Sequence, residues 1–67
     1  MVSIQLNNQA LTLPAGTTLA QALAQQQLDP QTHATAVNGN FVAREARDSY
    51  VLQSGDAVTC FQAIVGG

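Results

Sequence analysis

Gly66 and Gly67 end the chain, and the group they leave for chemistry is the α-carboxylate of Gly67. A terminal carboxyl group has a pKa of about 3.3–3.7, so it is ionised at neutral pH and is a poor electrophile. The usual route to its activation is ATP-dependent adenylation, after which an amine, a thiol or a persulfide attacks the acyl-adenylate. Because the chain has no groups of its own for that activation, we expect a carried substrate, with the catalysis in a partner.

The stretch QAIVGG, residues 62–67, contains no turn signal and no helical pattern, and its glycines oppose ordering. We expect a flexible tail over residues 62–67 that follows a folded domain over residues 1–61. Such a tail reaches about 20 Å at roughly 3.3 Å per residue. Since glycines lack Cβ atoms, Gly66 and Gly67 form a thin thread that fits a narrow cleft in a partner.

Cys60 and Phe61 stand just before this tail on a predicted strand, where successive side chains point to opposite faces. Val58 should face the core, which places Cys60 inside as a small apolar side chain rather than as a nucleophile. Phe61 then points outward. An exposed phenylalanine beside the tail predicts a contact surface for a partner, with packing at a sheet edge as the alternative.

The remaining polar side chains form no recognisable catalytic or metal-binding group. His33 is the only histidine, and we expect it in a solvated loop. Glu45 and Asp48 flank the two basic side chains, Arg44 and Arg47, which predicts a surface cluster of mutually screened charges. A docking role for the arginines is the alternative. The sequence therefore predicts neither an enzyme nor a bound metal.

The composition narrows the function classes further. The 67 residues make one small domain, with 46% hydrophobic residues for a core and only 9% charged residues. A net charge of −2 with no lysine argues against nucleic acid as a partner, and a single cysteine excludes an internal disulfide and a cysteine-based metal cluster. No apolar run approaches the roughly 20 residues of a membrane span, and no signal peptide is evident. We expect a cytoplasmic protein.

Hydrophobic periodicity divides the chain into short elements. Alternation predicts the strands, the Asn-Gly pair at residues 38 and 39 predicts a hairpin, and Thr17 or Thr18 caps a helix. The predicted elements are strands at 1–6 and 10–13, a helix that begins after Thr17 or Thr18 and runs to about Gln27, strands at 34–37, 41–42, 50–52 and 58–62, and an exposed turn at 44–48.

One helix among short strands predicts an α+β fold with a mixed sheet and the helix on one face. In so short a chain we expect the first and last strands to pair in parallel at the centre, which is the β-grasp, or ubiquitin-like, topology. A meander with an inserted helix fits the same periodicity, and the pattern leaves that alternative open.

Four stretches of the sequence resemble the ThiS family, the sulfur carriers of thiamine biosynthesis. They are MVSIQLNNQ at residues 1–9, AGTTLAQAL at 15–23, AVNGNFVARE at 36–45 and SGDAVTCFQAIVGG at 54–67. The last stretch is the most specific, because it combines a Gly-Asp turn, spaced apolar residues and the terminal Gly-Gly. The resemblance covers the whole chain.

This resemblance implies a ubiquitin-like β-grasp fold and a defined cycle of sulfur transfer. A ThiF-type adenylyltransferase would activate the C-terminal carboxylate with ATP and magnesium, and a persulfide-bearing donor enzyme would supply sulfur to form a thiocarboxylate. A thiazole synthase, ThiG, would then receive that sulfur. By position Gly67 bears the sulfur, Gly66 threads with it, and Phe61 and Ile64 contact partners. No cofactor would be bound permanently.

Three other functions use the same features. The small sulfur-carrying subunit of molybdopterin synthase has a similar fold and chemistry, but this chain is short for it and lacks a proline-rich approach to Gly-Gly. A ubiquitin-like modifier would form amide bonds through Gly67. A passive binding module would carry its Gly-Gly end without using it.

Overall fold

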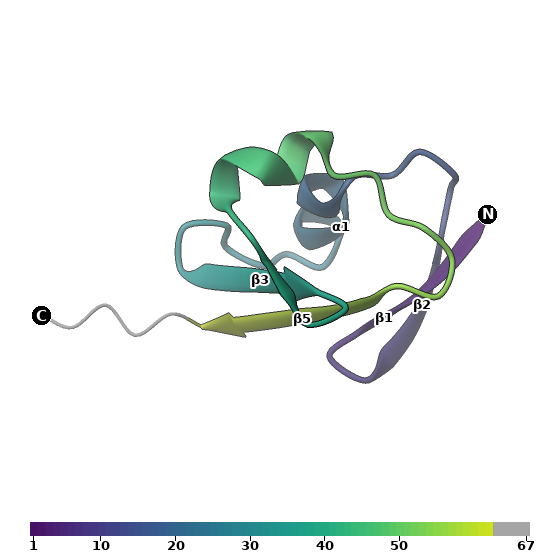
Figure 1. Ribbon diagram of the computed structural model, residues 1–67, viewed down its shortest axis with the longest axis horizontal. Helices are drawn as coiled ribbons and strands as arrows, with labels where there is room; N and C mark the ends of the chain where they lie inside the picture. The colour runs from purple at the N-terminus through teal and green to yellow at the C-terminus, as the bar shows by residue number, and fades with distance from the viewer. Residues whose placement is uncertain (63–67) are drawn as a thin grey trace, which may run out of the picture.

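The computed structural model describes residues 1–62, which form five strands, one α-helix and one 3-10 helix (Figure 1). Both helices lie on the same side of the sheet, and no helix of the described residues covers the opposite face. In chain order the elements are β1 (Val2–Leu6), β2 (Gln9–Leu13), α1 (Leu19–Gln25), β3 (His33–Val37), β4 (Asn40–Val42), the 3-10 helix η1 (Arg44–Ser49) and β5 (Ala57–Gln62).

The sheet places the last strand in its middle, in the order β2-β1-β5-β3-β4. β1 runs parallel to β5, with Gln5 opposite Ala57 and Leu6 opposite Val58, while the other neighbours pair antiparallel. This is the β-grasp arrangement that the sequence predicts. A meander is wrong, because all of its neighbouring strands would be antiparallel.

The ends of α1 are fixed by capping motifs. The hydroxyl of Thr18 accepts a hydrogen bond from the N–H of Gln21, and the Gln21 side chain accepts one from the N–H of Thr18, which together form a capping box. At the other end Gln27 takes a left-handed φ of 60°, and the N–H of Leu28 donates back into the last turn. The helix therefore ends at Gln25, earlier than the expected end at about Gln27.

The core lies between α1 and the inner face of the sheet. Each strand contributes the alternate side chains that point to the inner face, and α1 contributes the apolar side chains of one face. Leu28 packs against this cluster after the helix ends. The buried core residues are Ile4, Leu6, Leu13, Leu19, Ala22, Leu23, Val37, Val42, Leu52, Val58 and Cys60.

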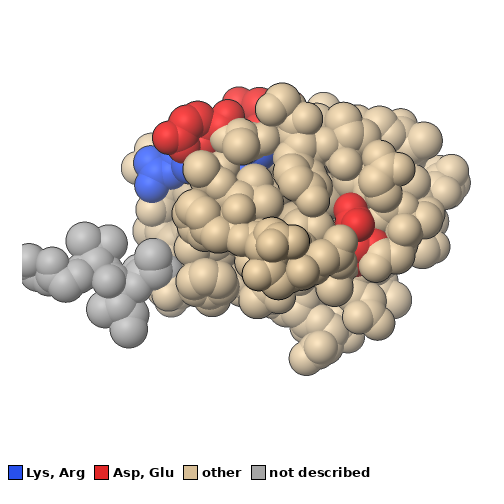
Figure 2. Space-filling model, in the orientation of Figure 1, with Lys and Arg blue, Asp and Glu red and all other residues tan. Residues whose placement is uncertain are grey.

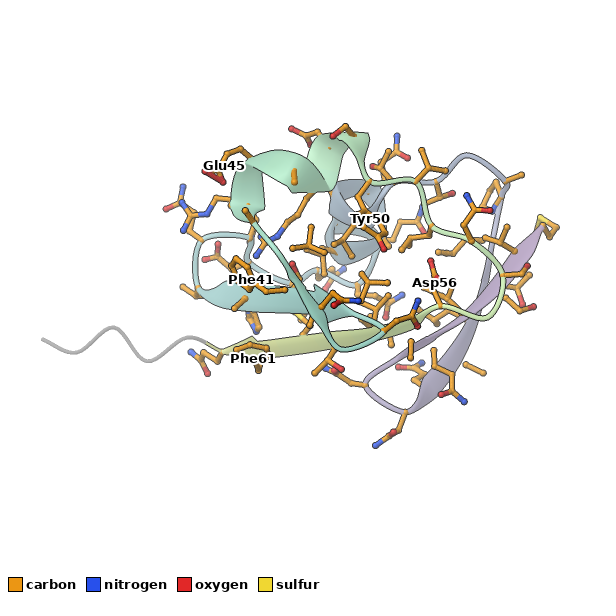
Figure 3. The ribbon with its side chains drawn as sticks, in the orientation of Figure 1. Phe41, Glu45, Tyr50, Asp56 and Phe61 are labelled. Atoms are coloured by element: carbon orange, nitrogen blue, oxygen red, sulfur yellow. The ribbon has the colours of Figure 1, made fainter. Side chains whose placement is uncertain are left out.

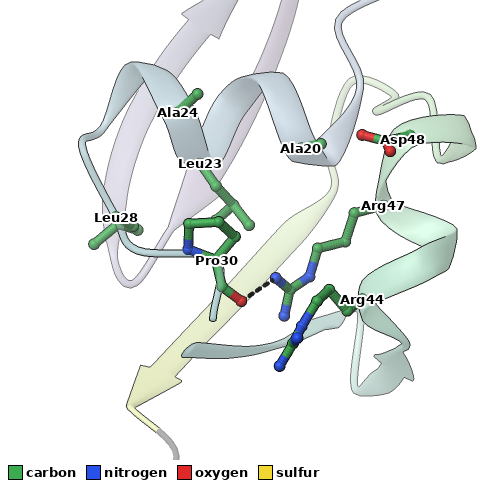
Figure 4. Close-up of a pocket in the computed structure, with 8 residues that line it drawn as sticks. All are labelled: Ala20, Leu23, Ala24, Leu28, Pro30, Arg44, Arg47 and Asp48. Carbon is green, nitrogen blue, oxygen red and sulfur yellow. Dashed lines mark hydrogen bonds between the residues drawn. The ribbon is translucent and has the colours of Figure 1, made fainter. Parts of the chain in front are cut away.

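Arg47 corrects the expectation of an exposed charged turn at residues 44–48. These residues belong to η1, and the side chain of Arg47 is only 4% exposed. Its guanidinium donates to the hydroxyl of Thr35 at 3.1 Å and to the carbonyl of His33 at 2.7 Å. It also donates to the carbonyl of Pro30 at 2.9 Å (Figure 4). It therefore links η1 to β3 and to the loop after α1. Arg47 is thus not part of the surface cluster that the sequence predicts with Arg44, Glu45 and Asp48.

Two other local predictions are wrong. Residues 50–52 do not form a strand, because Val51 makes only an isolated bridge to Thr18 while Leu52 is buried in the core. His33 does not lie in a loop: it is the first residue of β3, and its Nδ1 lies 2.9 Å from the carbonyl oxygen of Asp29. In both places pairing with a distant residue sets the conformation, since Val51 pairs with Thr18 and His33 pairs with Gln62.

Within residues 1–62, the helices are too short to cross a lipid bilayer.

Replacement of Arg47 by alanine tests its role as a link between three segments. We expect Arg47→Ala to lower the free energy of unfolding by about 3 kcal/mol, because two carbonyls and one hydroxyl lose a charged donor. Urea denaturation followed by circular dichroism measures the change. Arg44→Ala is the matched control, since Arg44 is exposed on the same 3-10 helix and should change stability by no more than about 0.5 kcal/mol. Equal effects of the two variants would contradict the assignment.

Candidate functional site

The end of β5 presents two faces of different character. Val58 and Cys60 point into the core, at 2% and 7% exposure, while Thr59 and Phe61 point away from α1. Both the inward position of Cys60 and the outward position of Phe61 are as the sequence predicts. β5 extends to Gln62, the strand end that the sequence predicts, and Gln62 pairs with His33. The first residue of the tail expected over residues 62–67 is therefore paired in the sheet.

A second exposed phenylalanine lies on the same face of the sheet as Phe61. Phe61 pairs with Ala34 of β3. Phe41 of β4 pairs with Ala36, which is the next residue of β3 whose side chain points outward. Phe41 is 71% exposed and Phe61 49% exposed, and Figure 3 labels both. We call the outward residues Ala34, Ala36, Phe41, Thr59 and Phe61 the phenylalanine face.

Sequence reasoning placed Phe41 in a strand but did not identify it as a site residue. The signal was present, because Val42 is the buried member of the same short strand and its neighbour must then point outward. What the sequence could not supply is the strand order. Only the placement of β4 beside β3, and β3 beside β5, puts the two phenylalanines on one surface.

The phenylalanine face carries no formal charge. None of the five strands contains Asp, Glu, Lys or Arg. The exposed charges of η1 lie on the helical side, where Figure 2 shows basic and acidic side chains grouped together. A surface of this kind recognises a partner through apolar burial and shape rather than through ion pairs.

Cys60 has the chemistry of a buried thiol. Burial raises the pKa of Cys60, and the nearby guanidinium of Arg47 opposes that rise without overcoming it. Since the thiolate is the nucleophile, a protonated thiol inside the core is poorly placed for catalysis. Its neighbour across the sheet is Thr35, whose hydroxyl donates to the carbonyl of Val42.

Within residues 1–62, no three side chains of His, Cys, Asp or Glu come together in a way that could hold a metal ion.

Of the residues that the sequence predicts as functional, the structure describes Phe61 but not the other three. Ile64, Gly66 and Gly67 lie outside the described residues, as does most of the tail predicted over residues 62–67.

Comparison with solved structures defines the class of protein. A crystal structure of a thiamine biosynthesis protein (ThiS) from Geobacter metallireducens superposes with a TM-score of 0.85 at 22% identity, covering 98% of this chain and 100% of the other. A ubiquitin-like protein from the archaeon Caldiarchaeum subterraneum superposes with a TM-score of 0.52 at 16% identity, covering 97% of each chain. The chain therefore has the ubiquitin-like β-grasp fold.

Sequence comparison defines the family within that class. The model of the ThiS family matches residues 4–67. The sulfur carrier protein ThiS of Escherichia coli (strain K12) is 35% identical over 66 residues, which cover 98% of this chain and 100% of that protein. This chain belongs to the ThiS family.

The buried position of Cys60 has a direct chemical test. We expect the thiol of the folded protein to react with a disulfide reagent at pH 8 roughly a hundredfold more slowly than in denaturant, because reaction requires local opening and a raised pKa keeps the thiol protonated. Stopped-flow absorbance measures both rates. A short unfolded peptide that contains a cysteine, measured in both solvents, corrects for the effect of denaturant on the reagent. Rapid reaction of the folded protein would contradict the assignment.

Proposed function

We propose that this chain is a sulfur carrier of thiamine biosynthesis and that the carboxylate of Gly67 is its working group. The observation that carries the proposal is the match to the ThiS family over residues 4–67, which includes the Gly-Gly end. The name of the Escherichia coli relative, a sulfur carrier protein, supports the same function. We place the carrier in the cytoplasm, where its activation by ATP would occur.

The proposed cycle has three steps, all catalysed by partners. A ThiF-type adenylyltransferase, using ATP and magnesium, joins AMP to the carboxylate of Gly67 and releases pyrophosphate. A persulfide attacks the acyl-adenylate and expels AMP, and reductive cleavage of the resulting S–S bond by a thiol leaves a thiocarboxylate. A thiazole synthase of the ThiG type then accepts the sulfur.

The described part of the chain supports a carrier role rather than an enzymatic one. Cys60 is buried and its pKa is raised, which disfavours the thiolate that an attack would need. His33 is engaged with the carbonyl of Asp29 at the start of β3. These two side chains are the ones a catalytic hypothesis would use first, and neither is paired with a partner that would activate it.

The phenylalanine face supplies a docking surface beside the tail. Phe61 lies one residue before the end of β5, so a partner that covers this face also stands close to where residues 63–67 begin. We propose that Phe61 and Phe41 bury apolar area against the partner, and that Ile64 extends this contact along the tail. Gly66 would accompany Gly67 into the active site because a residue without Cβ fits a narrow channel.

The central test is the mass of the intact protein after reaction. We expect incubation with a ThiF-type enzyme, ATP, magnesium, a persulfide donor and a thiol reductant to add the mass difference between one sulfur and one oxygen. Alkylation of the product distinguishes a thiocarboxylate from an oxidised side chain. Deletion of Gly67 should abolish the gain without changing the circular dichroism spectrum, whereas Cys60→Ser should retain it. A wild-type protein that neither forms the adenylate nor gains sulfur would refute the proposal.

The docking role of the phenylalanine face predicts a kinetic effect. We expect Phe61→Ala to raise the KM for the carrier in the adenylation reaction roughly tenfold, because an anchor of this size typically costs one to a few kcal/mol of binding. Pyrophosphate release measures the rate as a function of carrier concentration. Thr12→Ala is the control, since Thr12 of β2 is exposed on the same side of the sheet but lies outside the phenylalanine face. An unchanged KM for Phe61→Ala would place the docking surface elsewhere.

A further inference from the structure

The side chain of Asn7 makes two hydrogen bonds to the backbone of Cys60, 53 residues away in the sequence. Its Nδ2 donates to the carbonyl oxygen of Cys60 at 2.9 Å, and its Oδ1 accepts from the N–H of Cys60 at 2.8 Å. A carboxamide carries the same donor and acceptor as a peptide group. Asn7 therefore binds β5 in the way that a further residue of a neighbouring strand would.

These two bonds begin where backbone pairing between β1 and β5 stops. The N–H of Gln5 donates to Asp56 O at 2.9 Å and that of Asn7 donates to Val58 O at 3.0 Å, after which the chain turns away into the hairpin. On its other edge β5 remains paired with β3 as far as Gln62. Without the Asn7 side chain, the strand beyond Val58 would be held along one edge only.

The hairpin turn itself does not require this side chain. Asn7 and Asn8 both take left-handed backbone conformations, with φ of 50° and 71°, which asparagine and glycine tolerate equally well in such a turn. Among the described residues, Asn8 makes no side-chain hydrogen bond. The two asparagines share one backbone role, but only Asn7 reaches β5.

We propose that Asn7 is a positioning residue for sulfur transfer. It pins Cys60 on the β1 side and so keeps Phe61 and Gln62 in the strand. It thereby fixes the point and direction from which residues 63–67 enter the partner's active site. This inference rests on the proposed carrier function. Reaction rates depend steeply on such placement, since an error of about 1 Å at the reacting atoms can cost a hundredfold in rate.

The kinetic test compares Asn7→Gly with the matched control Asn8→Gly. Glycine suits the left-handed turn at either position, so the two variants differ chiefly in the loss of the bonds to Cys60. With the carrier as the varied substrate of a ThiF-type enzyme, we expect Asn7→Gly to lower the kcat of adenylation roughly tenfold, with KM unchanged or lower. Asn8→Gly should have both constants close to those of the wild type.

The division between kcat and KM separates positioning from simple destabilisation. A carrier that is only partly folded supplies less active substrate, which raises the apparent KM but leaves kcat unchanged at saturation. A carrier that docks normally and presents its tail poorly lowers kcat. A higher KM with normal kcat for Asn7→Gly would overturn the inference, as would two unchanged constants.

Amide hydrogen exchange supplies a second, non-kinetic measurement. We expect the Cys60 N–H to exchange at least roughly tenfold faster in Asn7→Gly than in Asn8→Gly, with the N–H of Thr35 in the neighbouring strand β3 unchanged. Equal exchange at Cys60 in the two variants would overturn the inference. Failure of the wild-type protein to be adenylated at all would refute the proposed function, and the role of Asn7 in transfer with it.

Discussion

The parallel pairing of β1 with β5 is the constraint on which the rest of this structure depends. It places the last strand between the first and third strands, so the segment before the tail is supported on both edges. It also brings the first hairpin beside Cys60, where Asn7 continues the pairing with its side chain. The same arrangement forces Val58 and Cys60 into the core and Phe61 to the surface. The proposed sulfur-bearing end thereby follows a strand that lies in the middle of the sheet.

The two faces of the sheet differ in what covers them and in charge. On the helical side α1 and η1 cover the core, and Arg47 links η1 to β3 through two uncharged acceptors and to the loop after α1 through a third. On the open side the strands present only apolar and uncharged polar side chains. Because the charged residues lie in the helices and loops, the phenylalanine face can be buried against a partner without desolvating a formal charge.

Sequence reasoning recovered the features that rest on local periodicity. Alternation around Cys60 predicted the correct inward and outward faces, and the cap at Thr17 or Thr18 predicted a helix where α1 begins. The sequence did not predict the burial of Arg47, because an arginine in a polar stretch is usually exposed and its carbonyl partners are distant in the sequence. It also missed Asn7 as a contact of Cys60, because no local pattern shows that this asparagine will bind a residue 53 positions away. The division into a domain and a flexible tail at residues 61 and 62 remains a prediction.

The central position of β5 has a consequence for how the protein is made. The ribosome synthesises this strand after all the others, yet the sheet has no middle without it. The contacts that complete the sheet therefore have a long sequence separation, and they can form only after β1 to β4 have been synthesised. A truncated product that lacks β5 would lack the middle strand of its sheet. Under the proposed carrier function, an enzyme that docks on Phe61 would therefore engage only chains that have the means to fold.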